Sequence, residues 1–338
     1  MQVLVTGAAG YIGSHALRAL TEAGHHAVAL DNLSRGHRRA IPDNVPFHQV
    51  DVRDTDGVEA ALREHRVDCV MHFAAFTAVG ESTENPLLYY DNNTRGTLSL
   101  LTAVERVGTP RLVFSSTAAT YGEPTEMPIR ETTPQAPINP YGMSKLMSEY
   151  MLRDYAAKSP HFGYSVLRYF NVCGCAADVS LGEDHEPETH LIPVILQAAL
   201  GKREKITVFG EDYPTPDGTC IRDYVHVEDL ADAHVKVMEA LAPGDARTYN
   251  LGIGRGHSVK EILDAVRRVV DRPFKVESGP RRAGDPPALY ADPSKIEREL
   301  GWRARHTDIA DAIGSAWRWF LAHPHGYGDS VPPGRPLP

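Results

Sequence analysis

The sequence is poor in cysteine and has no long apolar run. Its four cysteines, Cys69, Cys173, Cys175 and Cys220, lack the spacing of a zinc motif or of a disulfide framework, so we expect free buried thiols in a reducing cytoplasm. No stretch approaches the roughly 20 apolar residues of a membrane-spanning helix. The chain begins directly with a strand pattern, without a basic and apolar leader, which predicts a cytoplasmic protein.

An excess of positive charge is also missing. The chain carries 35 Lys and Arg residues against 44 Asp and Glu residues, a net charge of −9. Because nucleic-acid-binding proteins present a basic face, this balance argues against nucleic acid as a partner. What is present is the composition of a globular protein, 42% hydrophobic and 23% charged, in 338 residues that can form two lobes with a sizeable core.

Short apolar runs and helical patterns alternate through the first half of the chain. The alternation predicts an α/β fold with a doubly wound, Rossmann-type parallel sheet and right-handed crossovers. The expected strands are 2–6, 27–30, 46–50, 68–73, 111–115 and 164–168. The expected helices are roughly 11–23, 55–65, 86–107 and 140–158.

The alternation stops after about residue 172, where Gly, Pro and acidic residues gather. Shorter elements are expected near 190–200, 206–209, 225–241, 258–270 and 308–322. We expect an NAD-binding lobe of residues 1–172 plus about 220–246. A smaller α/β substrate-binding lobe would comprise about 173–219 plus 247–323. Residues 324–338, rich in Pro and Gly, should form a poorly packed tail.

Three glycines, Gly7, Gly10 and Gly13, follow the first strand and open the first helix. Glycine lets the backbone approach a pyrophosphate, and the helix N-terminus supplies amide donors. The spacing is GxxGxxG, so a turn without a ligand is the alternative. Asp31 ends the second strand, where a carboxylate would bond ribose hydroxyls and repel a 2′-phosphate, which favours NAD over NADP. Asp51, after the third strand, would reach the adenine or be an exposed carboxylate.

Tyr141 and Lys145 lie one helical turn apart, on a helix that Asn139-Pro140 is suited to begin. The hydroxyls at 115–117 follow the fifth strand, at the sheet edge where ligands bind in such folds. An exposed aromatic–aliphatic pair is the alternative if Tyr141 and Lys145 are taken alone. A phenol, an ammonium and hydroxyls behind a dinucleotide loop indicate proton transfer beside a hydride carrier, hence an oxidoreductase or an epimerase.

The pKa of Tyr141 sets how much electrostatic free energy Lys145 has to supply. A tyrosine with a pKa of about 10 must fall by roughly 3 units to act as a base at neutral pH, or about 4 kcal/mol. One ammonium at about 6 Å supplies roughly 3 kcal/mol at an effective dielectric of about 20. We therefore expect Lys145 to lower the pKa of Tyr141, with the cation of an oxidised nicotinamide supplying the remainder.

These residues resemble the extended short-chain dehydrogenase/reductase family, and within it the nucleotide-sugar 4-epimerases. The resemblance runs from Met1 to about His323. Each matching segment alone is a weak signal, whereas all of them in this order are a strong one. The matching segments are 5–15, 72–75, 79–82, 89–93, 114–116, 139–145, 167–171, 222–227 and 282–285.

The resemblance implies a protein with tightly bound NAD that interconverts UDP-glucose and UDP-galactose through a 4-keto intermediate. Tyr141 would take the proton from the sugar 4-hydroxyl, Lys145 would bond the nicotinamide ribose, and Thr117 would contact the same sugar oxygen. The residues implied to bind NAD are Gly7, Gly10, Tyr11, Ile12, Gly13, Asp31, Asn32, Ser34, Asp51, Val52, Phe73, Ala74, Ala75, Thr77, Asn92, Ser115, Tyr141, Lys145 and Tyr169. Those implied to bind the UDP-sugar are Thr117, Asn171, His190, Leu191, Thr207, Phe209, Arg222, Tyr224, Arg282, Asp285 and Leu289.

Several positions depart from the family pattern. Thr77 replaces a cofactor-contacting lysine of many members, and Thr117 replaces a serine. His190 replaces an asparagine used near the diphosphate, and a surface histidine is the alternative. Leu289 stands where the family varies between large and small residues, so the N-acetylhexosamine pair of substrates stays open.

Other functions stay open as well. A pentose 4-epimerase, a dehydratase or a reductase of nucleotide sugars would use the same fold. The run Thr117-Ala118-Ala119 lacks the acidic residues expected of a dehydratase, and a net reductase would need exchangeable cofactor. A non-catalytic dinucleotide-sensing protein would not need both Tyr141 and Lys145.

Asp184, His185 and His190 are too loosely spaced to predict a ligand set, so no metal is expected. The resemblance suggests a homodimer through the helices near 90–107 and 140–158.

Arg222 and Arg282 would be solvated charges by themselves, but a locally cationic groove is what a diphosphate needs.

Overall fold

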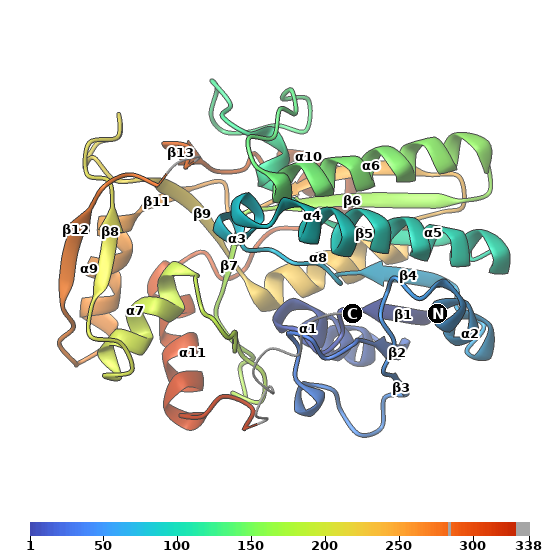
Figure 1. Cartoon of the computed structure of the whole chain (residues 1–338), viewed down its shortest axis with the longest axis horizontal. Coiled ribbons are helices and arrows are strands. Elements are labelled where there is room, and N and C mark those ends of the chain that lie inside the picture. The colour runs from blue at the N-terminus through green and yellow to red at the C-terminus, as the bar shows by residue number, and fades with distance from the viewer. Residues whose placement is uncertain (283–284, 329–338) are drawn as a thin grey trace.

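A seven-stranded parallel sheet forms the larger part of the molecule (Figure 1). The computed structural model of the chain describes residues 1–282 and 285–328. The sheet consists of β1 (Gln2–Thr6), β2 (His26–Leu30), β3 (Phe47–His48), β4 (Cys69–His72), β5 (Arg111–Thr117), β6 (Gly163–Tyr169) and β10 (Ala246–Leu251). The strand order β10-β6-β5-β4-β1-β2-β3 is the doubly wound order that the sequence predicted, and every neighbouring pair is parallel.

Helices cover both faces of this sheet because its strands are apolar on both sides. They are α1 (Tyr11–Glu22), α2 (Thr55–Glu64), α5 (Gly96–Val107), α6 (Pro140–Lys158) and α8 (Val227–Ala240). In β1, Val3 and Val5 pack in one apolar cluster with Leu17 of α1, whereas Leu4 packs in another with Leu62 of α2. Successive side chains of a strand point to opposite faces, so one strand anchors two layers of helix.

The helix expected at 86–107 is interrupted. After α3 (Val79–Glu84), which was not expected, α4 (Pro86–Tyr89) leads into a π-helical segment, η2 (Tyr90–Arg95), and then into α5. The wider turn contains a buried amide: Asn93 donates to the backbone oxygen of Phe76 and to Ser144 Oγ, and accepts from the Phe76 N–H. These partners are distant in sequence, so helical periodicity could not indicate the interruption.

The remaining strands form two smaller sheets at the other end of the molecule (Figure 1). In the first, β9 (Ile221–His226) pairs with β7 (Asn171–Cys173), β11 (Gly256–Ser258) and β13 (Ala288–Leu289). In the second, β8 (Ile206–Phe209) pairs with β12 (Val276–Gly279). Residues of α7 (Leu191–Ala199), α9 (Val259–Val269) and α11 (Ile309–Ala322) share a separate apolar cluster beside these sheets.

Two strands lie across the lobe boundaries that we expected. β9 falls within the segment 220–246 assigned to the first lobe but pairs with the smaller sheet. β10 reaches Leu251, beyond that segment, yet forms the edge of the large sheet. Near it, α10 (Ser294–Leu300) contributes Ile296 to the apolar cluster on the α1 side. The division into lobes at the stated positions therefore stays a prediction.

The end of the described chain is better packed than expected. Tyr327 is buried against the cluster around α11, and its hydroxyl donates to the backbone oxygen of Gly182 at 3.2 Å. The expectation of poor packing is therefore wrong for Tyr327, whereas Pro324, His325 and Gly328 around it are exposed. Residues 329–338 of the expected tail lie outside the described residues. Among the helices of the described chain, none is both long and apolar enough to span a membrane.

Candidate active site

The turn after β1 is built so that the backbone can approach closely. Gly7 has a φ of +69°, and a Cβ there would lie 2.6 Å from the backbone nitrogen of Ala74. A Cβ on Gly13 would lie 2.1 Å from the carbonyl oxygen of Gly7. Helix α1 begins here with Gly10 as its N-cap, which offers no side chain to the first amides. Those amides are therefore available to an anion.

Asp31 joins the end of β2 to this turn. Its buried carboxylate accepts the N–H of Ala9 at 3.0 Å and that of Leu33 at 2.8 Å. Burial raises the pKa of Asp31, while the two backbone hydrogen bonds oppose that rise. The carboxylate is thus held beside the glycine loop, at the sheet edge where a nucleotide would lie.

Asp51 is neither isolated nor freely exposed. Arg53 Nη2 lies 2.7 Å from Asp51 Oδ2, and Asn32 Nδ2 donates to the same oxygen at 2.9 Å. The hydrogen bond from Arg53 is the largest influence that lowers the pKa of Asp51, to about 2. Asn32 also accepts the N–H of Ser34 at 2.9 Å. The structure therefore connects three of the residues predicted to surround the adenosine.

The other predicted cofactor residues follow the strands at the same edge. Val52 comes after β3, Phe73 to Ala75 and Thr77 come after β4, Ser115 lies in β5 and Tyr169 ends β6. Tyr11 and Ile12 begin α1, and Asn92 is buried in η2. Strands of one parallel sheet end at a common edge, which is why residues so far apart in sequence converge.

Tyr141 and Lys145 are buried on α6. Asn139 caps this helix by accepting the N–H of Gly142 at 2.8 Å, and Pro140 is the first helical residue. Tyr141 is 9% exposed and Lys145 is 3% exposed, so the alternative of an exposed helix pair is wrong. Lys145 Nζ donates to the backbone oxygen of Ser115 at 2.9 Å and lies 5.0 Å from the centre of the Phe114 ring.

Burial dominates the proton affinities of both groups. It raises the pKa of Tyr141 to about 12, and a hydrogen bond with Thr117 opposes the rise. It lowers the pKa of Lys145 to about 7, against the attraction of Glu149. In the polypeptide by itself the pKa of Tyr141 is therefore raised, and the lowering expected from Lys145 together with an oxidised nicotinamide stays a prediction for the NAD-bound protein. Transfer of both groups out of water disfavours the charged form of each.

A buried ion pair joins β6 to α6, the helix that carries these two groups. Arg168 Nη2 of β6 lies 2.6 Å from Glu149 Oε2 of α6, and both side chains are almost fully buried. Ser116 donates to the same carboxylate, and Arg168 Nη1 donates to the hydroxyl of Tyr121 at 2.8 Å. Tyr121 in turn donates to Asn250 of β10 at 2.7 Å. The network links β5, β6, β10 and α6, and no local sequence pattern predicted it.

The residues predicted to bind the UDP-sugar fall into small groups. The Arg282 guanidinium carbon lies 3.9 Å from the centre of the Phe209 ring. Arg222 Nη2 lies 3.8 Å from Asp285 Oδ1, and Leu289 of β13 pairs in register with Arg222 of β9. Arg222 is thus mostly buried beside a carboxylate, whereas Arg282 lies over an aromatic face and is exposed.

The other predicted substrate residues belong to neighbouring elements. Asn171 of β7 pairs in register with Tyr224 of β9. Thr207 lies in β8, two residues before Phe209. Leu191 is the first residue of α7, and His190 is the N-cap of that helix.

His190 belongs to a cluster that the spacing did not predict. Its Nδ1 lies 2.9 Å from Glu183 Oε1 and 3.0 Å from Glu188 Oε1. His185 Nδ1 lies 3.3 Å from the same oxygen of Glu183. The sequence spacing of His185 and His190 gave no sign of this cluster, which forms because the loop before α7 folds back on itself. Burial opposes protonation, but the two carboxylates outweigh it and raise the pKa of His185 to about 9.

Comparison with known proteins gives the family. A model described as the NAD dependent epimerase/dehydratase family matches residues 3–252, about three quarters of the chain. This chain belongs to that family. A UDP-glucose 4-epimerase of Lactobacillus helveticus is 48% identical, with 97% of this chain and 100% of the relative covered.

Solved structures resemble this family member over nearly its whole length. UDP-glucose 4-epimerase from Bifidobacterium longum, in complex with NAD+ and UDP, has a TM-score of 0.93 and 40% identity, covering 96% of this chain and 100% of that one. A UDP-glucose-4-epimerase from Stenotrophomonas maltophila, with bound NAD and formylated UDP-arabinopyranose, has a TM-score of 0.90 and 42% identity, covering 96% and 99%.

NAD is the cofactor of this epimerase/dehydratase family member, and the site fits it. The crowding around Gly7 and Gly13 shows a backbone that tolerates no side chain where the pyrophosphate would lie. The carboxylate of Asp31 stands at the end of β2, where a ribose would be bound. The contributions of the individual residues to binding stay predictions.

Proposed function

We propose that this chain is a UDP-sugar 4-epimerase that interconverts UDP-glucose and UDP-galactose and keeps NAD bound throughout. The observation that carries the proposal is the placement of Tyr141 and Lys145. Both are buried on one face of α6, beside the hydroxyl of Thr117 and behind the glycine loop of the family. A binding protein without catalysis would have no use for a buried phenol and a buried amine at this point.

The residues that would hold NAD are distributed along the ends of the parallel strands. The glycine loop and the first amides of α1 would bind the pyrophosphate, Asp31 and Asn32 the adenosine ribose, and Asp51 and Val52 the adenine. Lys145 would bind the second ribose, with Ser115 and Tyr169 beside it. When bound, NAD supplies the acceptor for a hydride from the sugar C4 and its donor on the return.

Tyr141 would move the proton. Its phenolate oxygen takes the proton of the 4-hydroxyl while the C4–H bond breaks, which leaves a 4-keto sugar. The same phenol then returns the proton after the keto sugar has presented its other face. Burial favours the protonated phenol, so the ionised form that takes the proton must be stabilised by positive charge nearby. A protonated Lys145, fixed by Ser115, would supply part of that charge.

The UDP half would stay in place while the sugar turns. Arg222 and Arg282 offer two guanidinium groups from different elements, which suits a diphosphate. Phe209 and Tyr224 would flank the uridine side together with Leu191, Thr207 and Asn171. Asp285 would position Arg222, from which its carboxylate is 3.8 Å away. Leu289 and His190 would border the sugar and the diphosphate respectively.

One experiment tests this function directly. Purified protein is incubated without added cofactor with UDP-galactose, and in parallel with UDP-N-acetylgalactosamine, and the products are separated by chromatography. We expect UDP-glucose to form in the first reaction without accumulation of NADH. Stoichiometric release of NADH, or no conversion by protein that contains NAD, would contradict the proposal. The second reaction decides whether Leu289 admits an acetamido group.

We also propose a cytoplasmic homodimer that associates through α5 and α6. Six large apolar side chains are exposed among the described residues, and three of them, Leu98 of α5 and Met147 and Tyr150 of α6, lie on these two helices. Such a concentration on adjacent helices is typical of an interface. Sedimentation of Leu98→Glu, with Leu321→Glu on α11 as the control, tests it. A dimer that survives Leu98→Glu and Met147→Glu together would refute this interface. The four buried free cysteines support a reducing location.

A further inference from the structure

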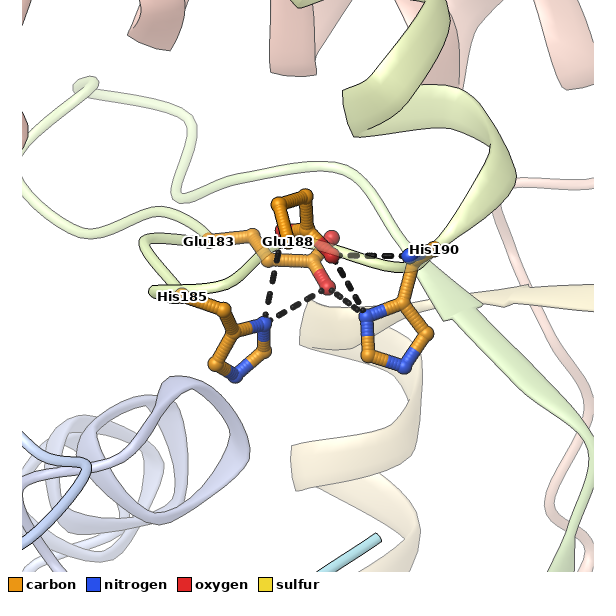
Figure 2. A group of neighbouring side chains, drawn as sticks. All are labelled: Glu183, His185, Glu188 and His190. Carbon is orange, nitrogen blue, oxygen red and sulfur yellow. Dashed lines mark hydrogen bonds and ion pairs between the residues drawn. The ribbon is translucent and has the colours of Figure 1, made fainter. Parts of the chain in front are cut away.

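Four side chains converge in the loop before α7, beside the proposed active site. They are Glu183, His185, Glu188 and His190 (Figure 2). Figure 2 shows both imidazoles turned with Nδ1 toward the two carboxylates. One donor atom from each of the four residues lies within 4.8 Å of the other three. The proposed epimerase reaction uses neither glutamate.

The two carboxylates are buried, and among the described residues no lysine or arginine pairs with them. The side chain of Glu183 is 6% exposed and that of Glu188 is 1% exposed. Within the described ranges, their ion pairs are all with His185 and His190. Arg203 donates to the backbone oxygen of Glu188, not to its carboxylate. Two buried negative charges this close require a positive charge between them.

His185 does not satisfy this requirement as an ordinary hydrogen-bond donor. Its Nδ1 is buried and lies 3.3 Å from Glu183 Oε1 and 3.5 Å from Glu188 Oε2, yet it makes no hydrogen bond of acceptable geometry within the described chain. An N–H group should point at one oxygen, whereas a metal ligand directs a lone pair at a point between several atoms. Nδ1 of His185 lies at similar distances from both carboxylates and is not directed at either one, as expected of a ligand to an ion between them.

The separations also fit a small cation. Nitrogen and oxygen ligands about 2.0–2.2 Å from a tetrahedral ion lie about 3.3–3.6 Å from one another. The four contacts between imidazole Nδ1 atoms and carboxylate oxygens, which involve both oxygens of Glu188, measure 2.9, 3.0, 3.3 and 3.5 Å. Adjustments of a few tenths of an ångström in the shorter pair would therefore admit the ion.

We propose that Glu183, His185, Glu188 and His190 bind one divalent first-row transition-metal ion, for which Zn²⁺ is the best fit. Two carboxylates balance the charge of one divalent cation. Two imidazole nitrogens select against Ca²⁺ and Mg²⁺, which take oxygen ligands, and four ligands suit the tetrahedral preference of Zn²⁺. All four positions are filled by the protein, which is typical of a structural site and not of a catalytic one.

The ion would fix the loop between two parts of the fold. The backbone oxygen of Glu183 accepts from Trp319 Nε1 of α11 at 3.2 Å, and the N–H groups of Thr189 and His190 donate to Glu188 Oε1 at 2.7 and 2.8 Å. The ring centre of His185 lies 6.4 Å from that of Tyr11, the first residue of α1. A metal here would thus tie the start of α7 to α11, next to the phosphate loop.

The test measures metal directly in the NAD-containing protein. Protein from medium supplemented with Zn²⁺ is dialysed extensively, and bound metal is counted by mass spectrometry. The dialysed protein is then stripped with a chelator and titrated with Co²⁺, whose visible spectrum reports tetrahedral coordination. We expect one ion per chain, a tetrahedral Co²⁺ spectrum, and an affinity lowered by about 10-fold or more in Glu188→Gln and in His185→Ala. We also expect chelation to lower the Tm of the wild type but not that of Glu188→Gln.

Control variants separate this site from other histidine clusters. His161→Ala removes an exposed imidazole that belongs to none of the candidate ligand groups and should leave the stoichiometry at one. His65→Ala and His306→Ala disrupt the groups His48, Glu64, His65 and His226, Glu228, His306, which also bring candidate ligands together. Loss of the ion in either of these variants but not in Glu188→Gln would overturn the proposal. Absence of bound Zn²⁺ after dialysis, or an octahedral Co²⁺ spectrum, would overturn it as well.

Discussion

Lys145 and Ser115 are joined by a hydrogen bond in which Nζ donates to the backbone oxygen at 2.9 Å. The bond connects α6 to the end of β5, two residues before Thr117, which holds the phenol of Tyr141. An ammonium has three donors, and within the described chain one of them is used here. Two donors are therefore left for a ligand, while the position of the nitrogen is already fixed.

Replacing Tyr141 by phenylalanine should abolish turnover and leave NAD bound. The substitution removes the proton carrier but keeps the ring in its buried place, so a loss of at least about 10²–10⁴-fold in kcat is expected. Product analysis and release of NAD by denaturation measure the two properties. Tyr150→Phe, on the exposed side of the same helix, is the control. Near-normal turnover in Tyr141→Phe would remove this residue as the base.

Replacing Lys145 by methionine should remove activity and also change how stability depends on pH. Folding lowers the pKa of Lys145 from 10.5 to about 7. Between these values the unfolded chain binds more protons, so the free energy of unfolding rises with pH from about 7 toward 10 through this group. Urea unfolding at several pH values should show a shallower rise in Lys145→Met. Parallel curves for the variant and the wild type would contradict this assignment.

Gly13→Ala should abolish NAD retention. The added Cβ would lie 2.1 Å from the carbonyl oxygen of Gly7, so the loop would have to open. Gly80→Ala is the matched control, since no atom lies within 4 Å of a Cβ built there. NAD content of the purified proteins, with circular dichroism as a check of folding, distinguishes the two. Full NAD content in Gly13→Ala would show that the loop is not the binding element.

Glu149→Gln should destabilise the fold by about 3–5 kcal/mol, because the buried guanidinium of Arg168 loses its counter-charge. The exposed pair of Arg18 and Glu22 provides the comparison, and Glu22→Gln should change the free energy of unfolding by about 0.5 kcal/mol or less. Urea denaturation measures both. Equal effects of the two substitutions would mean that the buried pair contributes no more than a surface pair.

Arg282→Ala should raise KM for the UDP-sugar by about 10-fold or more and leave NAD content unchanged, since a charge-assisted contact to a diphosphate is lost. Arg281→Ala is the control, because Arg281 bonds to Asp212 at the surface. Steady-state kinetics and NAD content are the measurements. If both ligands are lost together in Arg282→Ala, the substitution has disturbed the fold and not a substrate contact.

The sequence predicted most of the large sheet and its helices. The expected helix 140–158 coincides with α6, because Asn139-Pro140 marks its start and the chain turns polar at its end. Six strands of the sheet were predicted for similar local reasons. β10 was not, since an edge strand that joins from a distant part of the chain has no local signal. The residues of the glycine loop and of α6 were found because their chemistry follows a recognisable spacing.

Long-range contacts were beyond what the sequence could predict. The Glu149–Arg168 pair joins residues 19 positions apart on different elements. The π-helical turn depends on the backbone of Phe76, and the histidine cluster depends on how one loop folds. The rise that burial causes in the pKa of Tyr141 was missed for the same reason, because burial can be known only when the whole fold is known.

Tyr327 has a mechanical consequence for the molecule. Its backbone oxygen accepts from Arg39 at 2.6 Å, its N–H donates to Asp184 at 2.9 Å, and its ring stacks on His37 at 5.0 Å. Tyr327 thus connects the crossover after β2 to the loop before α7. Any movement of the crossover after β2 relative to the loop before α7 has to break these contacts. We expect Tyr327→Ala to speed amide hydrogen exchange in both loops. Unchanged exchange would show that the contacts of Tyr327 do not restrain them.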